Sequence, residues 1–204
     1  MELPMLLRHI KGLLTDPVSE WQSIRDEASS VPDIYTQYVM IVAAIAPVCA
    51  LIGTTTMGWR IGGGDPIKLT FASALSMAII FYVALLVATF TVGKLIHWMS
   101  QTYGASQPLA LCVALAAYAA TPLYLVGVIQ LVPILWLNFL VGLPALAYAV
   151  YLLYSGVPVV MGISPERGYL FSTSIMGVGL VMLVGLLAVM AGLWGVGVGP
   201  RFTH

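Results

Sequence analysis

The side chains best suited to metal or thiol chemistry are three histidines and two cysteines, and the sequence keeps them apart. His9, His97 and His204 lie in separate segments, without the HExxH or HxxEH spacing that brings two imidazoles to one metal ion. Cys49 and Cys112 both fall inside apolar segments, where a thiol is most often a small buried hydrophobic group. We therefore predict no metal site and no disulfide.

Motifs for a catalytic nucleophile or a bound phosphate are absent from the sequence as well. It contains no G-x-S-x-G, and "GGGDP" (62–66) lacks the Lys-Ser/Thr pair that a phosphate-binding loop requires. The apolar segments contain no Asp, so the paired aspartates of an intramembrane protease have no counterpart here. We predict that the protein is not an enzyme and that it binds no cofactor.

Uncharged polar residues and prolines gather instead around one helical hairpin. They are Tyr118, Thr121, Pro122, Tyr124, Gln130, Pro133 and Asn138. These groups could line a path for a solute, or they could form interhelical hydrogen bonds, each typically worth about 0.6 kcal/mol in membranes. Because no buried charge marks an ion or proton route, we favour the hydrogen bonds. A small channel or transporter with a path at the third and fourth spans is the alternative.

The elements that carry these residues must be membrane spans. Of the 204 residues, 60% are hydrophobic and only 8% are charged, whereas soluble domains carry about a quarter charged residues. Nine of the sixteen charged residues lie in the first 35 positions. The uncharged stretches that remain are of the length that a hydrocarbon layer roughly 30 Å thick selects. The sequence predicts an all-α membrane protein.

Five transmembrane helices are predicted, at about 37–57, 69–93, 108–129, 134–154 and 169–192. Pro133 marks a tight turn between the third and the fourth, and Ser164 followed by Pro165 is a helix-start signal for the fifth. A six-span arrangement would have to divide residues 95–165 into three, and the polar patch "SQTYGASQ" leaves too little length. The predicted domains are N-terminal interfacial helices (1–35), the membrane domain (36–198) and a short tail (199–204).

The first 14 residues are predicted to form an amphipathic helix. Leucine and isoleucine recur at i, i+3, i+4 and i+7 between Leu3 and Leu14, while Arg8 and Lys11 fall outside this stripe. Such a helix is too short and too charged to span a bilayer, but it suits the headgroup layer. Packing of the stripe on the protein's own core is the alternative.

A second amphipathic helix is predicted within "LLTDPVSEWQSI" (13–24). Asp16 is a good N-cap, and Pro17 loses no hydrogen bond at the first helical position. Trp21 is of the type that anchors at a membrane–water boundary, and Glu27 falls on the opposite, solvated face. We interpret Asp16, Pro17 and Trp21 as an elbow on the membrane surface.

The fifth predicted span carries small residues on one face. Gly185, Ala188 and Gly192 share this face with Gly195, and small residues permit close helix approach in membranes. The partner helix could belong to the same chain or to a second protomer, and the sequence leaves both open.

The distribution of basic residues predicts the orientation of the chain. An odd number of spans places the termini on opposite sides of the membrane, and the N-terminal side then carries five Lys and Arg residues against three. Basic residues are enriched on the cytoplasmic side, so we predict a cytoplasmic N-terminus and an external C-terminus. The five are Arg8, Lys11, Arg25, Lys94 and Arg167, and the three are Arg60, Lys68 and Arg201.

Three stretches of the sequence resemble the Yip1 family, in its bacterial branch. They are "LLTDPVSEWQSI" (13–24), "YAATPLYLVGVIQLVPILW" (118–136) and "YLLYSGVPVVMGISPERG" (151–168). They look like the family's pre-membrane Pro–Trp element, its Tyr-x-x-x-Pro third span with the following Ile/Val-Pro turn, and its Gly-containing fourth-span exit. The resemblance covers about residues 10–195. It implies five spans and a cytoplasmic N-terminus.

The resemblance implies less about activity. Eukaryotic members of the family bind Rab-type GTPases, but their long acidic N-terminal region is absent here, and "PDIYTQY" (32–38) lacks the Gly-Pro of their Asp-Leu-Tyr-Gly-Pro motif. We therefore expect no GTPase partner, and the zero net charge argues against nucleic acid. We predict a non-enzymatic scaffold of the bacterial inner membrane, whose partners are the lipid bilayer and a second copy or another membrane protein.

Overall fold

The structure is a computed structural model that describes residues 3–27, 29–60, 65–102, 104–195 and 202. The described chain is all-helical, as the sequence predicts. The helices in chain order are α1 (Leu3–Thr15), α2 (Pro17–Asp26), α3 (Val31–Ile34), α4 (Met40–Ala43), α5 (Ile45–Thr56), α6 (Phe71–Thr102), α7 (Leu109–Ala119), α8 (Thr121–Val126), α9 (Leu135–Met161) and α10 (Pro165–Gly195). A π-helical turn, Tyr35–Val39, joins α3 to α4, and a 3₁₀ turn, Gly127–Leu131, follows α8.

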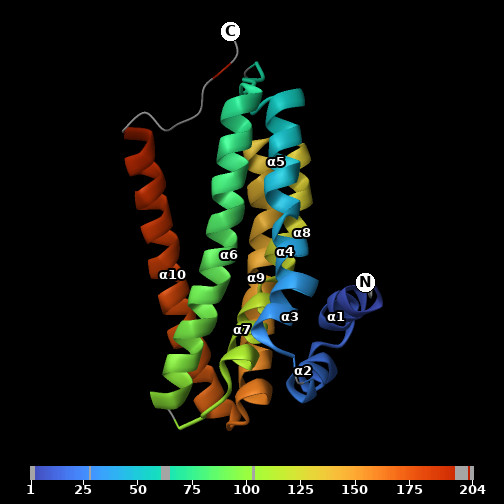
Figure 1. Cartoon of the computed structure of the whole chain (residues 1–204), viewed down its shortest axis with the longest axis vertical. Coiled ribbons are helices and arrows are strands. Elements are labelled where there is room, and N and C mark those ends of the chain that lie inside the picture. Colours follow the sequence, from blue (N-terminus) through green and yellow to red (C-terminus); the bar gives the residue numbers. More distant parts are fainter. Residues whose placement is uncertain (1–2, 28, 61–64, 103, 196–201, 203–204) are drawn as a thin grey trace.

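The long helices run roughly side by side, and α1 and α2 lie against the flank of one end of this bundle (Figure 1). Among the described segments, three are long and apolar enough to cross a membrane alone: Val31–Thr56, Phe71–Thr102 and Leu135–Met161. The pair Leu109–Ala119 and Thr121–Leu131 passes the same test only as a bent unit. These segments therefore provide three or four crossings, and α10 is a further helix of 31 residues.

The first and fourth spanning helices are longer than predicted because local signals extend them. The first starts at Val31 instead of about residue 37, since Ser30 and Asp33 form a capping box in which each side chain bonds the other residue's backbone N–H. The fourth continues past residue 154 to Met161, where Gly162 ends it in the left-handed conformation (φ +65°).

The predicted third span is bent by 42° between α7 and α8. Pro122 has no N–H to donate to the carbonyl of Tyr118, four residues earlier, so this carbonyl would be left free inside the bundle. The hydroxyl of Thr121 donates to it instead, at 2.6 Å. Proline thus removes one backbone hydrogen bond, and the neighbouring threonine supplies a replacement, as transmembrane helices require.

Close helix approach occurs at glycines that the sequence analysis did not single out. A Cβ on Gly93 of α6 would lie 2.6 Å from Val113 Cγ2 of α7, and a Cβ on Gly127 would lie 2.8 Å from Ala46 Cα of α5. Real Cβ atoms do not approach other atoms so closely, so a larger residue at either position would force the helices apart.

Helix α10 carries the small-residue face at a distance from the rest of the bundle. Towards its C-terminal end it stands apart from the other helices (Figure 1). Gly185, Ala188 and Gly192 are all exposed, and a Cβ on either glycine would meet no atom within 4 Å. The small-residue face therefore makes no close approach to another described helix in this structure.

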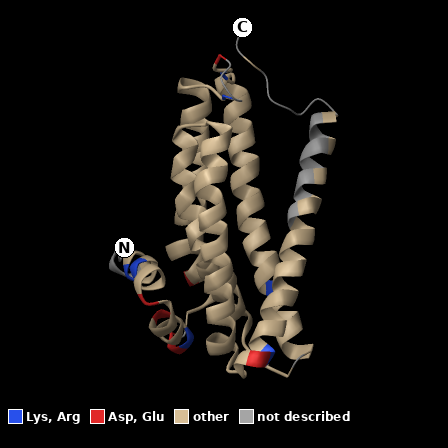
Figure 2. Ribbon diagram, turned by 180° about the vertical axis from the view of Figure 1, so that it is seen from behind, with Lys and Arg blue, Asp and Glu red and all other residues tan. Residues whose placement is uncertain are grey.

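Charged and apolar surfaces are distributed as a bilayer requires. Lys, Arg, Asp and Glu gather at the two ends of the bundle and on α1 and α2, and the helical surface between these ends is almost free of them (Figure 2). Large apolar side chains are exposed on this middle surface, among them Val87 (59%), Leu143 (61%) and Val181 (72%). Such a surface is unfavourable in water and favourable in lipid.

Candidate functional site

The turn between α1 and α2 forms as the sequence predicts. Helix α2 begins at Pro17, and the Asp16 side chain accepts a hydrogen bond from the backbone N–H of Ser19 at 3.4 Å. The carboxylate thereby satisfies one N–H that would otherwise lack a partner at the helix start. The prediction of an N-cap followed by proline is confirmed.

The Trp21 side chain packs inside the protein, whereas the sequence suggested that it contacts lipid. The side chain is completely buried, and a Cβ on Gly156 of α9 would lie 2.6 Å from Trp21 Cε2. The absence of a side chain at Gly156 therefore makes the room that the indole occupies. Trp21 anchors α2 to the protein's own helix α9, and not to lipid.

Two polar contacts support the same attachment. The Tyr148 hydroxyl of α9 donates to the carbonyl of Leu13 at the end of α1, at 2.8 Å. Arg25 of α2 donates to the carbonyl of Val159 near the end of α9, at 3.2 Å. Leu13 itself is completely buried. Both N-terminal helices are thus fixed to α9 at several points, in line with the alternative of packing on the core.

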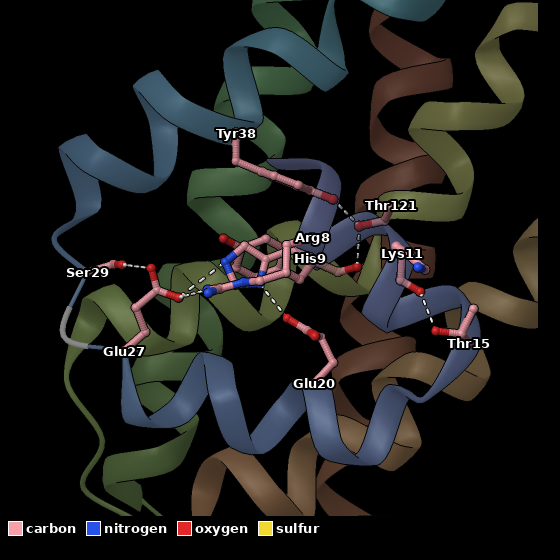
Figure 3. Close-up of polar contacts among 10 residues, drawn as sticks. Arg8, His9, Lys11, Thr15, Glu20, Glu27, Ser29, Tyr38 and Thr121 are labelled. Carbon is pink, nitrogen blue, oxygen red and sulfur yellow. Dashed lines mark hydrogen bonds and ion pairs between the residues drawn. The ribbon is translucent and has the colours of Figure 1, made fainter. Parts of the chain in front are cut away.

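A cluster of ionisable side chains around a buried histidine lies where α1 and α2 meet the bundle (Figure 3). His9 of α1 is 1% exposed, and its Nδ1 is 2.5 Å from a carboxylate oxygen of Glu20. Its Nε2 is 3.2 Å from a carboxylate oxygen of Glu27, which also pairs with Arg8 at 3.5 Å. Glu27 is therefore part of a charge cluster, and its placement on a solvated face was wrong.

The sequence contained a signal for this cluster that the motif search missed. His9 falls among Leu6, Ile10 and Leu13 at helical spacing, so it shares the face of α1 that carries the apolar stripe. A polar residue inside such a stripe is buried together with it, and it then requires partners.

A cavity of about 300 Å³ adjoins the cluster. Its lining residues are Leu6, His9, Glu27, Ser29, Asp33, Ile34, Gln37, Tyr38 and Tyr118. The Tyr118 ring contacts both His9 and Tyr38, with centroid distances of 5.1 Å and 4.4 Å. A second cavity of about 390 Å³ shares Glu27, Ser29, Ile34 and Tyr118 with the first and extends towards the start of α7.

The predicted polar cluster of the third and fourth spans is divided between two regions. Thr121 bonds the hydroxyl of Tyr38, and Tyr124 bonds Thr89 of α6, both at 2.5 Å. These two pairs lie close to Tyr118 and its bend at Pro122. They are interhelical hydrogen bonds, as the sequence analysis favoured.

The remaining members lie near the other end of the bundle. The carbonyl of Pro133 accepts a hydrogen bond from the backbone of Arg60 in the loop after α5. The carbonyl of Gln130 lies against Gly53 of α5. Asn138 donates to the carbonyl of Ile134 one turn earlier, at 2.8 Å, and its side-chain oxygen has no partner among the described residues. The structure therefore does not bring all the predicted site residues together.

The other residues considered for chemistry remain separate. His97 lies at hydrogen-bonding distance from the carbonyl of Gln107 and from Gln101, and Cys49 and Cys112 are free thiols. His204 lies outside the described residues. In the part of the chain that the structure describes, no group of three His, Cys, Asp or Glu side chains is arranged to hold a metal ion.

Long apolar helices with lipid-compatible sides and charged ends define a helical integral membrane protein. Its N-terminal helices are docked over a small polar cavity. The chain belongs to the Yip1 family, because the Yip1 domain profile matches residues 11–196. This membership confirms the resemblance seen in the sequence.

A curated relative agrees with this assignment over nearly the whole chain. The inner membrane protein YohC of Escherichia coli is 41% identical to this chain over 191 residues. These residues cover 94% of this chain and 98% of YohC. YohC from a second Escherichia coli strain gives the same identity and coverage. No solved structure matches the chain.

Proposed function

We propose that the chain is a non-enzymatic, five-span protein of the bacterial inner membrane that acts as an interaction scaffold through α1 and α2. Its relative YohC is named an inner membrane protein. In this proposal α7, α8 and the 3₁₀ turn together form the bent third span, and α10 forms the fifth. The N-terminus is cytoplasmic and the C-terminus lies outside.

The observation that carries the scaffold proposal is the outer face of the docked N-terminal helices. Leu7, Leu14 and Val18 are about half exposed, at 55%, 47% and 50%, although both helices are fixed to α9. Lys11 is exposed beside them. A rigid surface that combines aliphatic and basic side chains suits the lipid headgroup layer and the cytoplasmic side of a partner membrane protein.

In vivo photo-crosslinking tests this role. A crosslinking residue at Leu14 should give discrete protein adducts in addition to lipid adducts. The same residue at Val87, an exposed position of α6, serves as the matched control and should give lipid adducts alone. Identical adduct patterns at both positions would count against the scaffold.

Reporter fusions test the topology separately. Fusions after Gln107 and after Thr203 should report opposite compartments, cytoplasmic and external respectively. Matching compartments would mean that the number of crossings between the two positions is even, and the five-span proposal would be wrong.

Transport through the third and fourth spans is the second candidate, and the structure offers it less support. The cavity does reach Tyr118, but neither its lining nor that of the adjacent cavity includes Gln130 or Asn138. Tyr38 and Thr121 are bonded to each other at its inner end. Solute flux in liposomes that is lost on Asn138→Leu would overturn the scaffold proposal in favour of transport.

A further inference from the structure

A groove runs between α5 and α6, towards the end of the bundle where a loop joins these two helices (Figure 1). Its volume is about 360 Å³, and its lining residues come from α5 and α6, with Leu69 just before α6. Five of the thirteen lining residues are alanines, whose short side chains leave space between the helices. Ile80 and Phe81 of the lining are 40% and 44% exposed, so this α5–α6 groove opens on the apolar outer surface.

The polar groups of the lining are already bonded within the chain. Thr54 is the one polar residue of the described lining, and its hydroxyl donates to the carbonyl of Ala50 at 2.7 Å. The carbonyl of Thr54 accepts from the backbone N–H of Leu69 at 3.2 Å. An ordered water molecule requires two to four polar partners. The groove therefore suits hydrocarbon and not water.

The length of the groove matches the acyl chain of one leaflet. Along α6 the lining extends from Ala74 to Ala88, which is about 21 Å at 1.5 Å per residue. One leaflet contributes half of a hydrocarbon layer roughly 30 Å thick. An acyl chain that enters at the Ala74 end therefore finds an apolar lining down to the middle of the membrane.

The loop that joins α5 to α6 places basic side chains at the entrance of the groove. Trp59 and Ile67 exchange two backbone hydrogen bonds, at 2.8 and 2.9 Å, which hold the two arms of the loop together. Arg60 follows Trp59 on one arm, and Lys68 follows Ile67 on the other, directly before Leu69 of the lining. Both basic side chains are exposed.

The charge of this loop favours an anionic headgroup. Asp65 is the one acidic residue of its described part and is also exposed, so two positive charges accompany one negative charge. Basic side chains near a membrane surface attract anionic lipids, and a guanidinium group can bond two phosphate oxygens at once. The helical surface beyond the loop is almost free of charge (Figure 2), so the loop is where a headgroup finds charged partners.

We propose that the α5–α6 groove binds an anionic phospholipid, with one acyl chain between the two helices and the phosphate held by Arg60 and Lys68. A phospholipid combines the two properties that the site selects, namely a long hydrocarbon chain and an anion at its end. The proposal does not depend on the scaffold role, because α1 and α2 lie towards the other end of the bundle (Figure 1).

Native mass spectrometry of the full chain in detergent measures this binding. Titration with phosphatidylglycerol should give one tight lipid adduct, with an affinity about tenfold or more above that for phosphatidylcholine. Phosphatidylcholine with the same acyl chains is the matched control, since its headgroup has no net charge. The measured mass also distinguishes a lipid adduct from a dimer of the chain.

Variants of the loop test the headgroup contacts. Arg60→Gln combined with Lys68→Gln should weaken phosphatidylglycerol binding by about tenfold or more, because the attraction of two basic side chains is lost. Lys94→Gln, an exposed basic position towards the other end of α6, should change nothing. Asp65→Asn removes the opposing charge and should strengthen binding by about threefold, a gain that a misfolded protein could not show.

Variants of α6 test the position of the acyl chain. Ala84→Phe places a ring in the groove and should weaken phosphatidylglycerol binding by about tenfold, because several methylene groups lose their contacts. Val83→Phe is the matched control, since Val83 is 50% exposed and lies outside the lining, and it should leave the affinity unchanged.

The proposal is overturned by equal affinity for the two lipids, or by unchanged phosphatidylglycerol affinity in the folded double variant of the loop, in Asp65→Asn or in Ala84→Phe. A dimer that forms in place of the lipid adduct and is lost in Ala84→Phe would also overturn it, and would assign the groove to a second copy of the chain.

Discussion

Replacement of Trp21 by alanine should release α2 from the bundle without unfolding the spans. The indole is completely buried, and a buried tryptophan removes about 200 Å² of surface from solvent. At about 25 cal/mol per Å² this burial is worth about 5 kcal/mol if the released indole enters water. A released indole in the headgroup layer is more favourable than one in water, which lowers the loss. We expect Trp21→Ala to reduce the free energy of docking by at least about 2 kcal/mol.

Hydrogen exchange of residues 17–26 in nanodiscs measures this loss directly, because local opening of α2 exposes its amides. A change of about 2 kcal/mol corresponds to roughly 30-fold faster exchange through local opening. Trp98→Ala is the matched control, since Trp98 lies on α6 and is 64% exposed. Equal exchange in the two variants, or wild-type exchange as fast as that of a free peptide, would refute the docking of α2 by Trp21.

Three further variants test other parts of the structure. Asp16→Ala removes the N-cap of α2 and should cost about 0.5–2 kcal/mol of local helix stability, read from exchange at the first turn of α2. Tyr38→Phe removes the hydrogen bond to Thr121 and should lower stability against denaturation in mixed micelles by about 0.6 kcal/mol. Gly185→Leu combined with Gly192→Leu should leave this stability unchanged or slightly raised, because a Cβ on either glycine would meet no atom within 4 Å outside its own stretch of helix and leucine favours helix more than glycine does. Altered oligomeric state in the double variant, measured by light scattering, would assign this face to a contact between protomers.

Local features of the fold could be predicted from the sequence because neighbouring residues determine them. Asp16 with Pro17, and Ser164 with Pro165, each mark a helix start that the structure places at the proline. The positions of the long apolar helices follow from the need to bury about 20 residues in hydrocarbon. The capping box at Ser30 is equally local, and its omission put the start of the first span too late.

Features that depend on distant residues could not be predicted in the same way. The amphipathic pattern around Trp21 fits a lipid surface and a protein surface equally well. Gly156 of α9 decides between them, because its lack of a side chain leaves room for the indole. Nothing near Trp21 in the sequence points to this glycine. In the same manner, the carboxylates that face His9 come from the beginning and the end of another helix.

The attachment of the N-terminal helices to α9 has a consequence for biosynthesis. Leu13 and Tyr148, which hydrogen-bond each other, are 135 residues apart, so the ribosome completes α1 long before their docking surface exists. At about 5–20 residues per second this interval lasts roughly 7–27 seconds. During this time the apolar faces of α1 and α2, Trp21 included, have no α9 to cover them, and amphipathic helices of this kind suit the headgroup layer. We expect the amphipathic sequence to serve the nascent chain first at the membrane surface and the finished protein afterwards at α9.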